Sequence, residues 1–305
     1  MGRPCLLSTF HSRKIFPMIT AAIVKELRDK TSAPMMDCKK VLTETHGDID
    51  ASIKLLRERG ILKSSKMADR AANEGVITAR INSTATSGLL LEINCETDFV
   101  SKNESFQAFV GEIANALAAS DAADHAAALA LSHGEHTIED TIKSKVGEVG
   151  ENLQFRKYVR FNAAPGGVIA SYIHLGGKVG VLIEVGTTQA ATAGTDSFKE
   201  LIKDLTLHIA ACAPKGLSRE DIPQAIVDAE LDIFRTRLLA EGKPAAIIEN
   251  ILKGQIGKFF AESCFLEQGF VKDSDVKVSS LLEAKGKALG DTLTVTRFVR
   301  FGLGE

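Results

Sequence analysis

The residues of this sequence best placed to do chemistry lie in one short polar turn, residues 94–101, in which Asp98 precedes Phe99. An apolar, β-prone run comes before the turn at 89–93, and apolar residues at helical spacing follow it at 104–119. An exposed aromatic residue between a strand and a helix can anchor in a pocket of a partner protein. The structural alternative is that Phe99 covers the core as a hydrophobic staple and Asp98 accepts hydrogen bonds from nearby backbone amides.

Motifs of covalent and nucleotide chemistry are missing from the sequence. It has no GxxxxGK[ST] loop, no GxGxxG after a strand, no GxSxG and no HExxH. None of the five cysteines forms a CxxC pair, which disfavours a zinc site or a disulfide framework. His133 and His136 could bind a metal, but a solvated polar loop is the simpler interpretation because no further ligand is nearby. We therefore predict a binding protein that is not an enzyme and that needs no cofactor or metal.

Composition excludes two classes of partner. The 305 residues carry a formal net charge of −2, and the sequence contains no tryptophan and two tyrosines. Such a chain has no bulk attraction to phosphate backbones and few rings on which bases could stack, so no direct nucleic-acid binding is expected. No apolar run is long enough to cross a bilayer, so no membrane partner is expected either.

The chain resembles itself when it is shifted by 92 positions (167 − 75 = 92). Residues 75–77 align with 167–169, and residues 88–93 align with 180–185 without a gap. The apolar positions of the helix after each hairpin align as well. Two copies of a hairpin-then-helix unit are predicted, each covering one face of its strands with one helix.

Asp98 and Phe99 have no counterparts in the second copy, where Ala190 and Ala191 occupy the same positions. If the pair completed the fold of the unit, both copies would need it. Presence in one copy only favours a role outside the fold, although simple divergence would give the same difference.

The predicted fold class is α+β, with a small three-helix N-terminal module and a duplicated antiparallel core that carries an inserted helical hairpin. The expected segments are a disordered extension or short targeting peptide (1–17), a three-helix docking module (18–60), a linker (61–74), the first core lobe (75–152), the first part of the second lobe (153–222), a helical hairpin (223–272) and the return strand of the second lobe (273–305).

Several residues allow two interpretations. Met35 and Met36, near the start of a helix, suit a small core or an adaptable binding face. His208 lies beside an apolar stripe and is more simply a core residue than a ligand. The similar basic–aromatic strands at 156–161 and 296–301 are expected to be neighbours in one sheet, with their charges in solvent or, less simply, on phosphate.

Two motifs resemble the signatures of the translation elongation factor Ts family. One is Thr-Asp-Phe-Val at 97–100 after Glu-Ile-Asn-Cys, and the other is Met-Met-Asp-Cys-Lys-Lys at 35–40 in a small helical module. Together with the duplicated core, the resemblance extends over about residues 18–303. It implies a guanine nucleotide exchange factor for elongation factor Tu, with an N-terminal module like a ubiquitin-associated fold and a protruding coiled-coil arm.

The resemblance also implies roles for individual residues. Thr97, Asp98, Phe99 and Val100 match the segment that wedges near the partner's magnesium–nucleotide site. A second group matches docking contacts: Arg28, Met35, Met36 and His208. The expected location is the cytoplasm, or else a mitochondrial or plastid matrix. The alternative function is a scaffold or adaptor that binds through its helical module and arm, and the arm could also join two copies of the chain in a homodimer.

Overall fold

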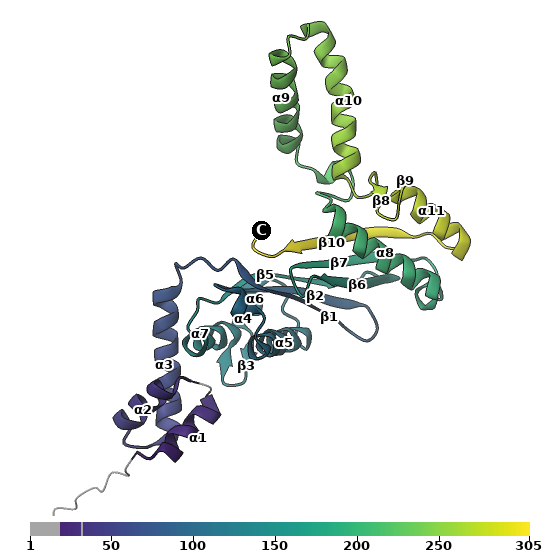
Figure 1. Cartoon of the computed structure of the whole chain (residues 1–305). Coiled ribbons are helices and arrows are strands. Elements are labelled where there is room, and N and C mark those ends of the chain that lie inside the picture. Colours follow the sequence, from purple (N-terminus) through teal and green to yellow (C-terminus); the bar gives the residue numbers. More distant parts are fainter. Residues whose placement is uncertain (1–18, 32) are drawn as a thin grey trace, which may run out of the picture. The chain divides into compact units, whose positions relative to one another are not determined.

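A computed structural model describes residues 19–31 and 33–305 (Figure 1). The extension expected at residues 1–17 lies outside the described residues. The chain forms two compact units: one joins the N-terminal residues up to Arg70 with Asp140–Leu153, and the other joins Ala71–Glu139 with Gln154–Glu305. Helices and antiparallel strands both contribute, which confirms the predicted α+β class.

The first unit is helical. It contains α1 (Ala21–Thr31), α2 (Met35–Glu44), α3 (Ile49–Met67) and most of α7 (Ile138–Val149). The three N-terminal helices and their connections bury one small apolar core, which consists of Val24, Leu27, Ala33, Cys38, Val41 and Leu42. Pro34 sits at the N-cap of α2, where its missing N–H costs nothing.

The third helix is longer than the sequence indicates. The predicted linker at 61–74 is wrong for residues 61–67, which continue α3 as far as Met67. Near this part of α3 the backbones of two helices meet, because a Cβ added to Gly147 of α7 would lie 2.6 Å from the Cα of Gly60. Only glycine permits such an approach. Tertiary packing of this kind outweighs the weak local helix signal of a Lys- and Ser-rich run.

The second unit is built on two three-stranded antiparallel sheets, each of which combines the hairpin of one repeat with a later strand of the same repeat. In the first sheet the order is β1 (Glu74–Ile81), β2 (Ser87–Cys95) and β5 (Gln154–Asn162). In the second sheet the order is β6 (Gly167–His174), β7 (Val179–Gly186) and β10 (Thr294–Gly302).

The two basic–aromatic strands, β5 and β10, are not neighbours, so the prediction that they share one sheet is wrong. β5 pairs with β2, and β10 pairs with β7. The central strands of the two sheets, β2 and β7, each keep one free edge after pairing with the other strand of their hairpin. The third strand of the same repeat pairs with that edge.

The sheets pack against each other through a shared apolar layer. Six buried residues from the two sheets form it: Ile77, Leu90, Phe161, Ile169, Leu182 and Phe301. Two glycines 92 positions apart (180 − 88 = 92) allow the close approach. A Cβ on Gly88 would lie 2.8 Å from Cγ2 of Ile169, and a Cβ on Gly180 would lie 2.4 Å from Cγ2 of Ile77.

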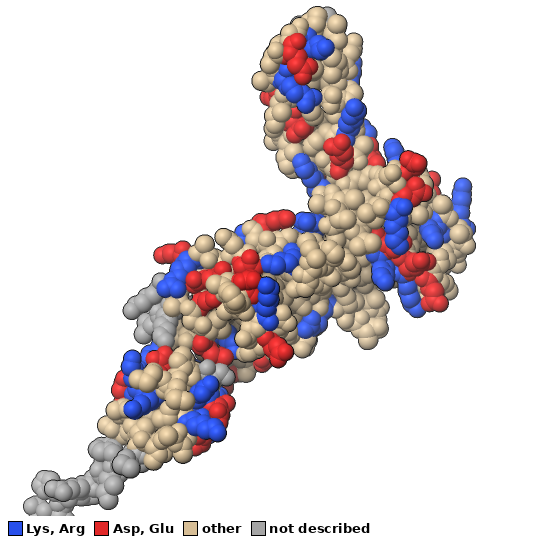
Figure 2. Space-filling model, in the orientation of Figure 1, with Lys and Arg blue, Asp and Glu red and all other residues tan. Residues whose placement is uncertain are grey.

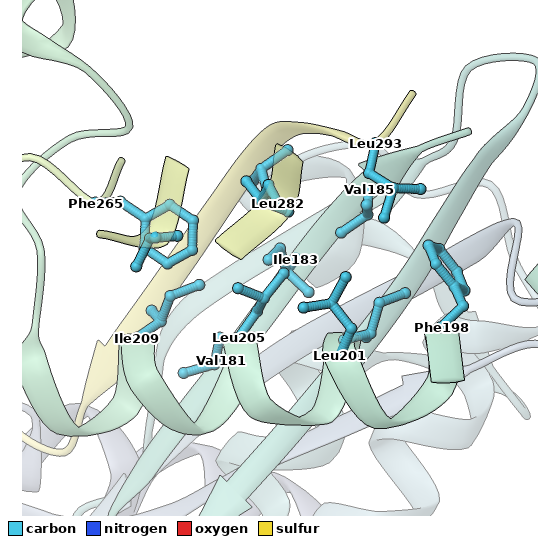
Figure 3. Close-up of a cluster of buried hydrophobic side chains, with 13 residues drawn as sticks. Val181, Ile183, Val185, Phe198, Leu201, Leu205, Ile209, Phe265, Leu282 and Leu293 are labelled. Atoms are coloured by element: carbon cyan, nitrogen blue, oxygen red, sulfur yellow. The ribbon is translucent and has the colours of Figure 1, made fainter. Parts of the chain in front are cut away.

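One long helix packs on each sheet, as the repeat predicts. α5 (Glu104–Ala118) packs on β1 and β2, and α8 (Asp196–Cys212) packs on β6 and β7. Figure 3 shows the core beneath α8, where Phe198, Leu201, Leu205 and Ile209 point towards the sheet. The N-caps also correspond, because Asn103 of α5 and Thr195 of α8 are 92 positions apart (195 − 103 = 92) and both accept backbone hydrogen bonds.

The repeat continues beyond the part that the sequence comparison detects. α11 (Val278–Leu289) and β10 begin 140 positions after α7 and β5 (278 − 138 = 140; 294 − 154 = 140). The hairpins are offset by only 92 (179 − 87 = 92). The second repeat therefore contains 140 − 92 = 48 additional residues after α8.

Most of these additional residues form an arm of two helices, α9 (Gln224–Ala240) and α10 (Ala245–Ser263), which projects from the core in Figure 1. Leu238, Ile248 and Leu252 are buried between the two helices.

Each repeat also has a short hairpin before its last helix. In the first repeat, β3 (Ser132–His133) and β4 (His136–Thr137) follow α6 (His125–Ala130) and precede α7. In the second repeat, β8 (Gly269–Phe270) and β9 (Asp273–Lys277) precede α11. Over the part of the chain that is described, every helix is too short or too polar to cross a membrane.

The charges of the basic–aromatic strands serve the fold. Arg160 of β5 donates to the carbonyl of Leu117 in the last turn of α5, and Arg300 of β10 donates to the carbonyl of Ala210 in the last turn of α8 at 3.4 Å. Cations at these positions satisfy free carbonyls and complement the helix dipole. Another basic residue of each strand forms an ion pair with a buried carboxylate of the neighbouring strand. Lys157 lies 3.6 Å from Glu92, and Arg297 lies 2.7 Å from Glu184. A phosphate-binding strip is therefore not supported.

We expect Arg160→Met to lower the free energy of unfolding by about 1–2 kcal/mol, because carbonyls at the end of α5 lose a charged donor while the stem's packing is kept. Urea titration followed by circular dichroism measures the change. Lys253→Met, on the exposed surface of α10, is the matched control and should change the value by less than about 0.5 kcal/mol. Equal effects of the two substitutions would show that the capping contact is not stabilising.

Candidate partner-binding site

The turn that contains Asp98 is a short, well-anchored helix, α4 (Asp98–Ser101), directly after β2. The Thr97 hydroxyl caps it by accepting from the N–H of Val100 at 3.4 Å. At its other end, the side-chain amide of Gln107 on α5 donates to the carbonyl of Ser101 at 3.2 Å. A capped turn tied to the neighbouring helix holds its side chains in fixed positions, which lowers the entropy cost of binding.

Phe99 projects from this turn into solvent. Its exposure is 84%, whereas Phe106 and Phe109 on the following helix are 1% and 7% exposed. The interpretation of Phe99 as a hydrophobic staple is therefore wrong. A large aromatic side chain held in water by a rigid turn is unfavourable for the isolated protein and typical of a binding anchor.

Asp98 forms an ion pair with Lys102, whose Nζ lies 2.7 Å from Oδ2 of the carboxylate. The hydrogen bond from Lys102 lowers the pKa of Asp98, and the charge of Lys178, the residue before β7, lowers it further. Lys178 in turn pairs with Glu74 of β1 at 2.6 Å. The carboxylate thus stays ionised at neutral pH. Its main partner is Lys102, beside a weaker backbone hydrogen bond of the kind expected from the sequence.

A second exposed apolar residue, which the sequence analysis missed, belongs to the turn between β6 and β7. Leu175 is 70% exposed and has a left-handed backbone with φ of 49°. Gly177 fixes the turn against β1, because its carbonyl accepts from the N–H of Ile77 at 2.9 Å. The available signal was the comparison of the two hairpin turns: the first, at 82–87, is polar, whereas the second contains Leu175.

Three of the four residues matched to docking lie on the surface of the first unit. Arg28 on α1 is exposed, and Met35 and Met36 at the start of α2 are 53% and 63% exposed. The methionines therefore form a surface and are not part of the small core. Flexible, polarisable thioethers on a surface suit an adaptable contact.

His208, the fourth residue matched to docking, is fully buried. Its Nε2 lies 2.8 Å from Oε1 of Gln268, and its Nδ1 accepts from the N–H of Val271 at 3.1 Å. Because both ring nitrogens are satisfied inside the protein, the structure does not support a direct partner contact by His208. In the same repeat His174, at the end of β6 beside Leu175, is exposed.

Burial lowers the pKa of His208 below its ordinary value of 6.5. A histidine that is harder to protonate when folded stabilises the protein above the unfolded pKa, and this contribution is lost as the pH falls below about 6.5. We therefore expect the free energy of unfolding to decrease between pH 7.5 and 5.5. His208→Gln, which can still accept from Val271, should show a shallower decrease in the same urea titrations. Identical pH slopes for the two proteins would contradict the assignment.

The remaining candidates for chemistry among the described residues are the cysteines and the pair His133 and His136. Cys38, Cys95 and Cys264 are buried, and burial raises the pKa of the Cys38 thiol. His133 lies 3.2 Å from Glu112, and the described residues contain no group of three side chains that could hold a metal ion. Acidic and basic side chains are interspersed on the face seen in Figure 2, so that face has no broad basic surface for a nucleic acid.

Comparisons with known proteins agree on one family. The family model described as "Elongation factor TS" matches residues 96–305. The protein named elongation factor Ts of Trichlorobacter lovleyi is 40% identical over 290 residues, which are 94% of this chain and 93% of that protein. Those of Clostridium perfringens and Nitratidesulfovibrio vulgaris are each 41% identical over 94% of this chain and over 94% and 96% of their own lengths. With its duplicated core and its Thr97–Val100 turn, the chain belongs to the elongation factor Ts family.

Proposed function

We propose that this protein is a guanine nucleotide exchange factor that promotes release of GDP from elongation factor Tu during translation elongation. Family membership supports this general role, and the exposure of Phe99 on an anchored turn carries the specific mechanism. In that mechanism Phe99 enters a pocket near the partner's magnesium–nucleotide site, and Asp98 acts beside it. The place of action is the compartment in which elongation factor Tu works, the cytoplasm or an organelle matrix.

Exchange of this kind needs binding energy and no covalent step. A nucleotide held with nanomolar Kd represents about −12 kcal/mol of binding, and release accelerated ~10⁴-fold needs about 5.5 kcal/mol off the barrier. An exchange protein that binds the nucleotide-free partner more tightly than the loaded one weakens the partner's affinity for nucleotide. By linkage, nucleotide weakens the partner's affinity for the exchange protein to the same extent. A desolvated aromatic anchor can supply about 2–4 kcal/mol of the difference.

Other surfaces must supply the rest. The exposed side chains of Arg28, Met35 and Met36 in the first unit offer a mixed basic and apolar surface for docking. Leu175 offers a second apolar point in the same unit as Phe99. This division of labour is supported by exposure: these side chains lie in water in the isolated chain, where burial against a partner would be favourable.

The reciprocity of linkage tests the proposal. The affinity of this protein for elongation factor Tu is measured by titration calorimetry at increasing GDP concentrations. We expect the affinity to fall steadily as GDP rises, and to be highest for the nucleotide-free partner. A scaffold or adaptor that binds without affecting the nucleotide site would give an affinity independent of GDP.

We also propose that the arm joins two copies of the chain. Four apolar residues of α9 and α10 are 42–62% exposed and support this: Ile226, Ile233, Leu239 and Ile247. Light scattering should then give twice the mass of one chain for the wild type and a lower mass for Ile233→Asp. A wild-type mass of one chain at high concentration would exclude the dimer.

A further inference from the structure

The second repeat has an open apolar groove between β6 and α8, here called the β6–α8 groove. Its volume is about 430 Å³. Its walls are formed mainly by Val168, Ala170 and Tyr172 of β6 and by Phe198, Ile202 and Thr206 of α8. Val168, Ala170 and Tyr172 are half-buried on one side of the groove, whereas Phe198 and Ile202 are buried at its base. The groove leaves room for apolar side chains of another polypeptide.

In the first repeat, a side chain of the protein itself lies across the equivalent position. Arg80 is the counterpart of Tyr172 (172 − 80 = 92). Arg80 extends from β1 over α5, where its Nε donates to Asn115 at 2.6 Å and its guanidinium donates to the carbonyl of Gly111 at 3.3 Å. Tyr172 does not span the groove in this way, because its hydroxyl pairs with His174 on its own strand at 2.9 Å. Arg80 thus lies across the position in the first repeat that Tyr172 leaves open in the second.

Beside the groove runs a free strand edge. β6 is the outer strand of its sheet, and backbone groups along a strand point alternately to its two sides. The N–H of Ile169 points outward, since it donates at 2.7 Å to the carbonyl of Ala85 in the turn of the first hairpin. Ser171 and Ile173 have the same orientation, and no described residue bonds their outward N–H and C=O groups. The edge is therefore half occupied by the protein and half available.

The rim of the groove is basic. Lys199 and Lys203 are exposed, lie one helical turn apart on α8 and are the only charged residues among the described residues that line it. Lys199 makes a surface pair with Asp196 at 3.6 Å, which contributes little in solvent. An occupant that complements this rim is acidic. The N-terminal residues 1–18 contain Arg3, Arg13 and Lys14 and no acid, so they do not fit.

We propose that the partner protein lays an extended segment along the free edge of β6, with apolar side chains in the β6–α8 groove and an acidic side chain at Lys199 and Lys203. The inference rests on the proposed function, because the partner is taken to be elongation factor Tu. β6 connects the groove with the exposed Leu175, because the strand runs from Ala170 in the groove to the turn that carries Leu175. Main-chain bonds to Ser171 and Ile173 supply affinity, and the groove and its lysines supply selectivity.

Hydrogen exchange on the full-length protein tests the strand addition directly. Amide exchange of Ser171 and Ile173 is measured by NMR in the free protein and in the complex with nucleotide-free elongation factor Tu. We expect both amides to be slowed at least about tenfold in the complex. The charge is tested by Lys199→Glu/Lys203→Glu, which should weaken the complex about tenfold and most strongly at low salt. Lys277→Glu/Lys287→Glu, which reverses two exposed lysines of the same repeat, should change affinity less than about twofold.

The outcomes separate this inference from the proposed function. If the wild type releases GDP from its partner but the two amides exchange at unchanged rates, the strand addition is wrong and the exchange function stands. If the amides are protected but both double variants bind equally well, the acidic occupant is wrong. If the wild type neither binds the partner nor releases GDP, the proposed function fails first. An Ala193→Trp variant, which fills the groove without changing charge, should weaken the complex in the same direction as the lysine reversal.

Discussion

Phe99→Ala is expected to slow stimulated GDP release about a hundredfold, which corresponds to ~2.7 kcal/mol of transition-state stabilisation. The reason is that the ring is the largest exposed apolar side chain of α4 and is desolvated only when it enters a partner. Stability should not change, because a side chain 84% exposed buries little surface on folding. Stopped-flow release of a fluorescent GDP analogue gives the rate, and thermal unfolding gives the stability.

Val271→Ala is the matched control, since it shortens another exposed apolar side chain, 40% exposed, in the turn between β8 and β9. It should leave the release rate within about twofold of the wild type. If Phe99→Ala lost stability and exchange activity in proportion, the ring would be a structural residue, and its assignment as the anchor would be wrong.

Phe198→Ala is expected to have the opposite signature and the largest effect on stability. Phe198 is fully buried at the start of α8, beneath which Val181, Ile183 and Val185 of β7 complete the core (Figure 3). Removing the ring loses its transfer free energy and leaves a cavity that close-packed neighbours fill only in part. We expect the free energy of unfolding to fall by about 3–5 kcal/mol in urea titrations.

Phe198 also forms part of the wall of the β6–α8 groove, so the release rate per folded molecule is expected to fall, but far less than for Phe99→Ala, at a temperature where the variant remains folded. Phe198→Leu keeps most of the apolar volume and is the conservative control, with a loss of about 1–2 kcal/mol. A loss below about 1 kcal/mol for Phe198→Ala would show that this core is not packed as described. Comparing the two phenylalanines therefore contrasts an effect mainly on GDP release with an effect mainly on stability.

Periodicity and self-similarity predicted the fold class, the duplicated hairpin and helix, and the two helices of the arm, because apolar spacing within a segment reflects one buried face. They could not predict which strands pair. β5 and β10 look alike because each closes its own repeat, and the 48 additional residues (140 − 92 = 48) hid this equivalence from a comparison at constant offset. The length of α3 was also missed, since the contact between Gly60 and Gly147 joins distant parts of the chain.

The candidate site was predictable where local sequence determines exposure. Asp98 and Phe99 stood out because the second repeat lacks them, and the structure places Phe99 in solvent. His208 could not be placed from its helix alone, because its partners, Gln268 and Val271, follow the inserted arm. Leu175 was overlooked because an apolar residue in a glycine-rich turn has no helical or strand periodicity to mark it.

Catalytic stimulation of GDP release is the most direct test of the exchange function. Elongation factor Tu loaded with a fluorescent GDP analogue is mixed with a small fraction of this protein and excess unlabelled GDP. We predict that the wild type accelerates release with many turnovers per molecule, and that the folded Asp98→Ala/Phe99→Ala variant does not. Acceleration by both proteins would keep the function but move its mechanism away from α4. No acceleration by the wild type would contradict the account and favour a scaffold or adaptor.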